Sequence, residues 1–163
     1  MYLLIFVFLY FVCTFSGGGK KDSWRNIEET GEFVVNIISD WMVESANYTS
    51  GDFPFEVDEM EASGLTPAAS IKVKPNRVKQ SAVQMECKTS HVQHIYNDAG
   101  EHTCAVVFGR VVMFHVVEPL LQTTARGAHE VKFDGYNPVG RLGGDTWTEL
   151  GAKFDISRPS IQK

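Results

Sequence analysis

The residues that could do chemistry in this sequence lie together in the stretch FSGGGKKDSWRN, which covers positions 15–26. Its glycines allow the backbone to approach a ligand closely, and Lys20 and Lys21 add two positive charges. Ser23 supplies a hydroxyl group and Asn26 an amide, at the start of an expected helix whose free N–H groups favour anions. An apolar strand, a glycine turn, lysines and a helix start in this order predict a cradle for a phosphate group.

Two other interpretations of this stretch remain open from the residues alone. It matches neither the P-loop pattern G-x-x-x-x-G-K-[ST] nor the dinucleotide pattern G-x-G-x-x-G, so a solvated turn that caps a helix also explains it. The apolar run before it, MYLLIFVFLYFVCTF, could be a targeting or membrane segment that ends in charges. A signal peptide, however, would begin with a positive region, and a helix of this length spans only about 22 Å of a roughly 30 Å hydrocarbon core. The aromatic and β-branched residues of the run favour a buried strand.

The composition is that of a single globular domain. With 163 residues, of which 44% are hydrophobic and 21% charged, the chain is long enough for one core. The net charge of −5 argues against nucleic-acid binding. Cys13, Cys87 and Cys104 are odd in number and far apart, which indicates reduced cysteines in a cytoplasmic compartment. No cluster of His, Cys, Asp or Glu in the sequence has the spacing of metal ligands.

Strands dominate the rest of the sequence. Apolar patterning and turn residues predict strands at 32–39, 82–95 and 102–117 and short helices at 23–30 and 40–47. The alternation of apolar and polar residues from Ala82 to Lys88 indicates a half-buried strand. Gly109 lies inside the longest β-rich run, where a glycine indicates a bend or a bulge. The whole pattern predicts a mainly β, mostly antiparallel barrel with peripheral helices.

The stretch FSGGGKKDSWRNIEETGEFVVNIIS resembles the flavin reductase-like family, whose members fold as FMN-binding split β-barrels. In that family a strand is followed by a Lys-Asp-Ser/Thr-x-x-Asn turn, a helix, and a strand that ends in Val-Asn-Ile/Leu. The resemblance continues through ESANYTSGDFPFEVDEMEASGLTP, where the family has Asn-x-Thr-Ser and Gly-Leu-Thr-Pro, and then reaches GRVVMFHV, NPVGRLGGDTW and FDISRP. It covers residues 12–159, most of the chain, with the motifs in the family's order.

The resemblance also implies a domain organisation. It places a divergent apolar segment at 1–10 and a flavin reductase-like domain at 11–163, and it assigns 11–16 to the barrel strand that leads into the phosphate turn. Family members carry further strands and an Asn-x-Ala/Ser-Pro-x-Ser segment before this strand. Because the sequence has no such section, we expect the domain to be truncated at its N-terminus.

Matching the family's motifs position by position implies a set of cofactor-binding residues. They are Ser16, Gly17, Lys21, Asp22, Ser23 and Asn26 for the phosphate, Asn47, Thr49 and Ser50 near the flavin, and His115 facing the flavin or a nicotinamide. The alternative for the turn from Asn47 to Ser50 is that it forms a polar cap at the end of a helix. The alternative for His115 is that it is held by an ordinary hydrogen bond and does not contact a ligand. The acidic run around Glu59 is interpreted as a solvated helix face.

By resemblance, the chain is expected to bind FMN and to transfer hydride from NAD(P)H to it, as a homodimer without nucleic-acid or membrane partners. Such a reaction requires binding and orientation from the protein, so we assign no catalytic acid or base and no metal. The alternative function is a non-catalytic flavin-binding module or an inactive truncated paralogue, which the missing N-terminal section suggests.

Overall fold

The computed structural model describes residues 10–16, 22–152, 154–156 and 159, and for residues 10–16 it describes the backbone alone. In chain order the elements are β1 (Tyr10–Ser16), α1 (Asp22–Thr30), β2 (Glu32–Asn36), the 3-10 helix η1 (Asp40–Met42), α2 (Val43–Tyr48), α3 (Glu59–Ala62), β3 (Pro67–Ala68), β4 (Arg77–Val78), β5 (Val83–Tyr96), β6 (His102–Val116), the 3-10 helix η2 (Glu118–Leu120), β7 (Leu121–Thr123), β8 (His129–Val131), β9 (Val139–Gly143) and β10 (Thr146–Glu149). Strands outweigh helices and every described strand pair is antiparallel, so the expected fold class and the expected main elements are confirmed.

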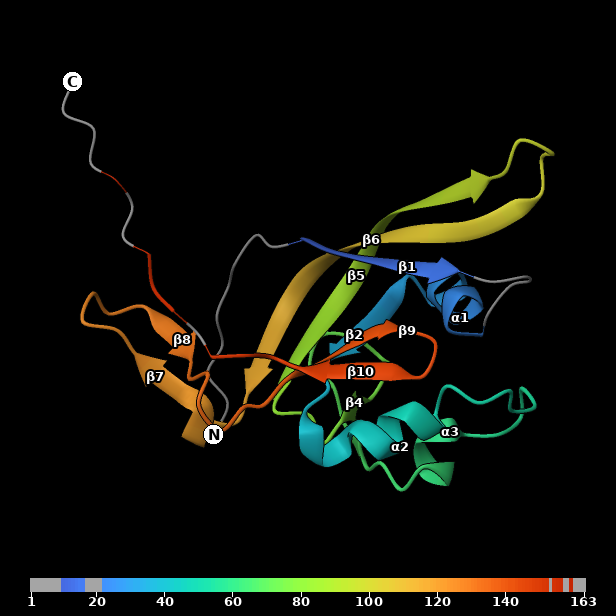
Figure 1. Ribbon diagram of the computed structural model, residues 1–163. Coiled ribbons are helices and arrows are strands. Elements are labelled where there is room, and N and C mark those ends of the chain that lie inside the picture. Colours follow the sequence, from blue (N-terminus) through green and yellow to red (C-terminus); the bar gives the residue numbers. More distant parts are fainter. Residues whose placement is uncertain (1–9, 17–21, 153, 157–158, 160–163) are drawn as a thin grey trace.

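A four-stranded sheet with the order β1-β6-β5-β2 forms the centre of the molecule (Figure 1). Its middle is the long β5–β6 hairpin, which a tight turn closes. The Asn97 side-chain oxygen accepts hydrogen bonds from the N–H groups of Ala99 at 3.0 Å and Glu101 at 2.9 Å. Gly100 has a φ of 79°, which glycine adopts without strain. β1 and β2 pair with the two outer edges of this hairpin, so the hairpin sets the register of both strands.

The N-terminal strand predicted from the apolar run is confirmed from Tyr10 onward. β1 pairs with β6 along its whole length, from Tyr10 opposite Arg110 to Ser16 opposite Cys104. Positions 1–9 lie outside the described residues. In the part of the chain that the structure describes, no helix combines the length and the apolar character needed to span a membrane.

The main apolar core joins α1 to the sheet. Phe33 of β2, Cys87 of β5 and Val107 of β6 are buried together with Ile27 of α1. Full burial of such a side chain contributes about 1.5–3 kcal/mol. The apolar side of α1 is therefore fixed on the sheet, while Ser23 and Asn26, on the same helix, remain exposed.

Gly109 lies at the irregularity that the sequence predicts. Thr89 pairs with Gly109 and His91 pairs with Phe108, so Ser90 is an extra residue in β5 at this point. The ring of Phe33 packs directly on the glycine: a Cβ atom added there would lie 2.7 Å from Cε1 of Phe33 and closer still to Cζ. The bulge and the absence of a side chain together make room for the core aromatic ring.

The expectation that the strand from Ala82 to Lys88 is half-buried is wrong. Both faces of Val83 to Cys87 are buried, and Gln84 and Glu86 are 2% and 0% exposed. The segment 69–77 covers the face on which these two polar side chains lie, and it satisfies them with hydrogen bonds. Alternation alone cannot distinguish a solvated face from a polar face that another segment covers.

The described strands do not close into a barrel. Around the central sheet, β3–β4, β7–β8 and β9–β10 form three separate two-stranded sheets. Figure 1 shows the β7–β8 hairpin at the end of the molecule away from α1. The residues that line the candidate site come from α1, β2 and the segment from α2 to β4.

We predict that Gly109→Ala lowers the free energy of unfolding by roughly 1–3 kcal/mol, because the new Cβ atom would force Phe33 out of its packed position. Urea unfolding measures the change. Gly140→Ala is the matched control, since a Cβ atom there meets only Thr148 Cγ2 at an ordinary 3.6 Å and the expected change is within about 0.5 kcal/mol. Equal stability of the two variants would contradict the packing argument.

Candidate functional site

The first turn of α1 opens on a hollow of about 280 Å³. Asp22 and Ser23 line it from the helix, and Thr49 and Ser50 line it from the turn that follows α2. The structure thus brings together four of the residues that the family resemblance predicts. Asp52 and Phe53 from the following loop and Glu59 from α3 complete its described lining with Gly51.

Two of the hydroxyl residues that line this smaller hollow, Thr49 and Ser50, form hydrogen bonds within the turn that follows α2. The Thr49 hydroxyl donates to the carbonyl oxygen of Ala46 at 2.8 Å, and the Ser50 hydroxyl donates to that of Asn47 at 2.7 Å. Because their protons are used within the chain, both oxygens face a ligand as acceptors. Asn47 itself is exposed on α2 and does not line this hollow.

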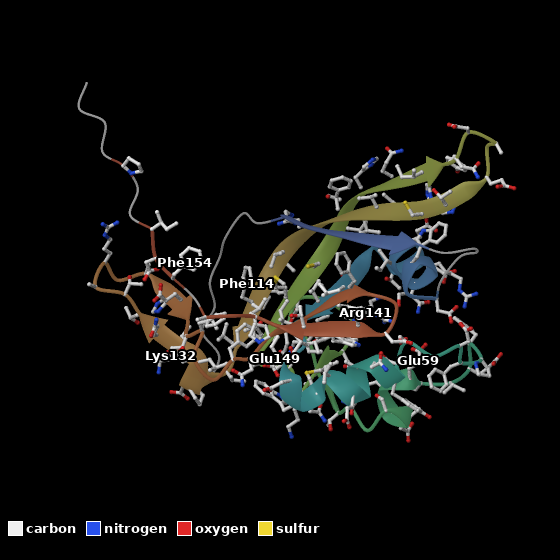
Figure 2. The ribbon with its side chains drawn as sticks, viewed as in Figure 1. Glu59, Phe114, Lys132, Arg141, Glu149 and Phe154 are labelled. Carbon is white, nitrogen blue, oxygen red and sulfur yellow. The ribbon has the colours of Figure 1, made fainter. Side chains whose placement is uncertain are left out.

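Carboxylates give the smaller hollow an acidic character. Burial raises the pKa of Glu59 above its usual value, and the charges of Asp22 and Asp58 raise the pKa further. Figure 2 shows Glu59 on the side of the molecule where α1 lies, whereas Lys132 and Phe154 lie at the other end. Asp58 and Glu61 are exposed, as expected for a solvated helix face, whereas Glu59 is half-buried and lines this hollow beside Asp22 and Asp52.

One cation lies close to this acidic group. Arg25 pairs with Asp22 at 3.0 Å, and its guanidinium lies 3.6 Å from the centre of the Phe55 ring. This contact connects α1 to the loop that precedes α3, because a guanidinium is attracted to the face of an aromatic ring. The positive charge of Arg25 offsets part of the negative charge of the carboxylates at the N-terminus of α1.

A second, larger hollow of about 810 Å³ adjoins the first at Ser23. It lies between α1, the outer edge of β2 and the segment 74–76, and its volume is typical of ligand pockets. Its lining consists of Ser23, Asn26, Ile27, Thr30, Glu32, Phe33, Val34, Val35, Asn36, Met60, Lys74, Pro75 and Asn76. Lys74 is the single positively charged residue in this described lining.

Contacts at the far end of the β5–β6 hairpin orient α1. The Trp24 ring stacks on His102 with 4.6 Å between ring centres, and Glu28 Oε1 lies 3.2 Å from His94 Nε2. His94 and His102 are in turn 3.2 Å apart, between Nδ1 and Nε2. With Ile27 in the core, these contacts fix the rotation of the helix and hence the direction of Ser23 and Asn26.

The buried Glu86 carboxylate fixes the opposite wall of the larger hollow. It accepts hydrogen bonds from the N–H groups of Ile71, Lys72 and Val73 at 2.8, 2.5 and 3.2 Å. Arg77 approaches it at 3.9 Å. Burial alone would raise the pKa of Glu86, but the N–H bonds of Ile71 and Lys72 and the contact with His115 outweigh burial and lower it. The carboxylate is therefore ionised at neutral pH.

His115 lies in this buried network and not in either hollow. It is 1% exposed, and its Nε2 atom lies 2.6 Å from Glu86 Oε1. Burial lowers the pKa of His115, the contact with Glu86 opposes the change, and the charge of Arg77 lowers the pKa further. A neutral imidazole therefore donates its Nε2–H to the carboxylate, which corresponds to the alternative that the sequence left open for this histidine.

The remaining predicted residues have different positions. Ser16 ends β1, where it pairs with Cys104, and Gly17 and Lys21 lie outside the described residues. Asn26 lines the larger hollow. The sequence analysis missed Lys74 and Glu86, for which no local motif exists.

Two adjoining hollows lie beside a helix start on a mainly β scaffold, and comparison with known proteins identifies the family of the chain. The model of the flavin reductase like domain matches residues 11–132. An uncharacterized protein from Halalkalibacterium halodurans is 34% identical over 146 residues, which are 90% of this chain and 68% of that protein. The chain belongs to the flavin reductase-like family, which places it among flavin-related oxidoreductases.

Solved structures agree with this assignment. Nitrilotriacetate monooxygenase component B from Bacillus cereus matches with a TM-score of 0.82 and 29% identity, over 95% of this chain and 76% of that chain. A protein from Shewanella frigidimarina, described as a flavin reductase with a split barrel domain, matches with a TM-score of 0.70 and 22% identity, over 84% of this chain and 65% of that chain. The split-barrel fold that the resemblance implies is confirmed, although the sheet of the described residues is open.

We predict that Glu86→Gln lowers the free energy of unfolding by roughly 3–5 kcal/mol at pH 7, because Arg77 loses the charge that faces it and the N–H groups of the segment 71–73 lose an ionised acceptor. The pKa of Glu86 is lowered in the folded chain from an ordinary 4.5, so its stabilisation is complete above that pH. The stabilisation is lost as the pH falls through the folded pKa. The variant should therefore lose less stability than the wild type between pH 5 and pH 3.

Urea unfolding at pH 7, 5 and 3 measures both effects. Glu61→Gln is the control, since Glu61 is an exposed carboxylate whose neutralisation should change the stability by no more than about 0.5 kcal/mol. If Glu86→Gln has the same pH dependence as the wild type, the buried carboxylate is not ionised in the folded chain.

Proposed function

We propose that this chain binds FMN at the start of α1 and transfers hydride to it from NAD(P)H. The observation that carries the proposal is the meeting of two hollows at Ser23, in a chain of the flavin reductase-like family. A hydride transfer requires two ligands whose reacting atoms approach closely, and adjoining hollows provide this arrangement. A homodimer in the cytoplasm is part of the same proposal and follows from the family resemblance.

The residues of the smaller hollow suit the flavin's polar chain. Its carboxylates and the Thr49 and Ser50 oxygens are acceptors, which match the hydroxyl donors of a ribityl group. The phosphate would be held by the helix start, by the Ser23 hydroxyl and by Lys21, with Ser16 and Gly17 beside them. Asn47 stays in the proposal on the family motif alone.

The protein's own part in this reaction is to bind and orient. The flavin, when bound, supplies the redox chemistry of hydride acceptance. Ser23 and Asn26 are presented by a helix that Ile27 and Trp24 fix on the sheet, so the ligand contacts are preorganised. No side chain is required to move a proton.

The alternative is a flavin-binding module without reductase activity. The acidic lining of the smaller hollow motivates it, because Asp22, Asp52 and Glu59 repel a phosphate group and a flavin held weakly there would not be placed for hydride transfer. The two functions are separated by purifying the protein, recording its visible absorbance with and without added FMN, and then measuring NADH and NADPH oxidation. A flavin spectrum with no nicotinamide oxidation would support the module, and a flavin spectrum with oxidation supports the reductase. A protein that takes up no flavin contradicts both functions.

We predict that Lys21→Ala weakens FMN binding by about ten- to a hundredfold, because a charge-assisted hydrogen bond contributes roughly 1.5–3 kcal/mol. Riboflavin has no phosphate, so its affinity should change far less. Titration of both flavins by fluorescence quenching, with wild type and variant, gives the comparison. Equal losses for the two flavins, or no loss for FMN, would remove Lys21 from the phosphate site.

A further inference from the structure

The larger hollow has a charge that the proposed flavin contacts do not use. Lys74 is the single cation of its described lining, and it lies across the hollow from α1. Within residues 22–152, the Lys74 ammonium forms no ion pair with a carboxylate. The nearby Glu32 instead pairs with Lys88, at 3.6 Å.

The backbone around Lys74 is held rigidly. Its N–H group donates to Glu32 Oε2 at 2.9 Å, and the three preceding N–H groups donate to the buried Glu86 carboxylate. At the other end of the segment, the Arg77 guanidinium donates to the Ala69 carbonyl oxygen at 2.9 Å. A ligand that meets Lys74 therefore has to order only one side chain and no loop.

The rest of the lining indicates which class of ligand would use this cation. Met60 and Pro75, which are both half-buried, offer apolar surface for a flat heteroaromatic ring. Asn76 offers an amide that can bond to sugar hydroxyls. Rings, sugars and phosphates occur together in nucleotides, and a volume of about 810 Å³ leaves room for a ligand larger than one mononucleotide.

We infer that the larger hollow binds the nicotinamide dinucleotide and that Lys74 contacts its pyrophosphate. The inference rests on the proposed function, because the dinucleotide must reach the flavin at the junction formed by Ser23. Lys74 is then a residue for recognition of the second substrate. It makes no contact with the flavin and takes no part in the hydride transfer itself.

The test compares Lys74→Met with Lys72→Met. Both lysines lie on the same segment with exposed side chains, but Lys72 does not line the hollow. NADH is titrated by its own fluorescence into flavin-free protein, and FMN is titrated separately by absorbance. Lys74→Met should weaken NADH binding by about ten- to a hundredfold and leave FMN binding unchanged. Lys72→Met should change neither, and Lys74→Arg should retain NADH binding because it keeps the charge.

Steady-state kinetics give a second readout. The KM for NADH should rise in Lys74→Met while kcat stays within about twofold, as expected for a binding contact that is equal in the ground and transition states. Equal NADH affinity in Lys74→Met and wild type overturns the inference and leaves the proposed function intact. A loss of FMN affinity in Lys74→Met, or an equal NADH loss in Lys72→Met, also overturns it. Wild-type protein that binds neither ligand overturns the proposed function as well.

Discussion

The buried Glu86 carboxylate is the constraint on which the candidate site depends. A carboxylate removed from water is strongly unfavourable unless hydrogen bonds and charge compensate it. Here the compensation comes from three N–H groups of the segment 71–73, from His115 and from Arg77. Because the three N–H donors belong to a segment without regular structure, the carboxylate determines where that segment lies. The same carboxylate thereby places residues 74–76, which follow this segment and line one side of the larger hollow.

The other wall depends on α1, which is held by a different kind of contact. Ile27 enters the apolar core, and Trp24 stacks on a histidine of the β5–β6 hairpin. The larger hollow therefore lies between a segment that is held by hydrogen bonds to a buried charge and a helix that is held by apolar packing, with the outer edge of β2 between them. Ser23 belongs to both hollows because it lies at the first turn of the helix, where the two walls approach each other.

Much of the fold and part of the site could be predicted from the sequence. β-branched runs identify β5 and β6, and the family motifs identify Asp22, Ser23, Thr49 and Ser50, which the structure brings together in one hollow. Glu86 could not be found in this way, because it alternates with apolar residues and alternation normally indicates a solvated face. What buries Glu86 is the segment 69–77, whose path over the sheet depends on hydrogen bonds between positions far apart in sequence. Lys74 was missed for the same reason, since its place follows from the path of that segment.

The central position of the β5–β6 hairpin also constrains the order in which the chain can fold. Among the described strands, β1 pairs only with β6, and in the central sheet β2 pairs only with β5. The two strands of the hairpin are joined by a short turn, so the entropy cost of closing it is small, whereas β1 must close a loop that contains about half of the chain. Neither outer strand has a template before the hairpin exists. We therefore expect this sheet to assemble outward from a local nucleus in the second half of the sequence, with the N-terminal strand, which leads to the candidate flavin site, incorporated after it.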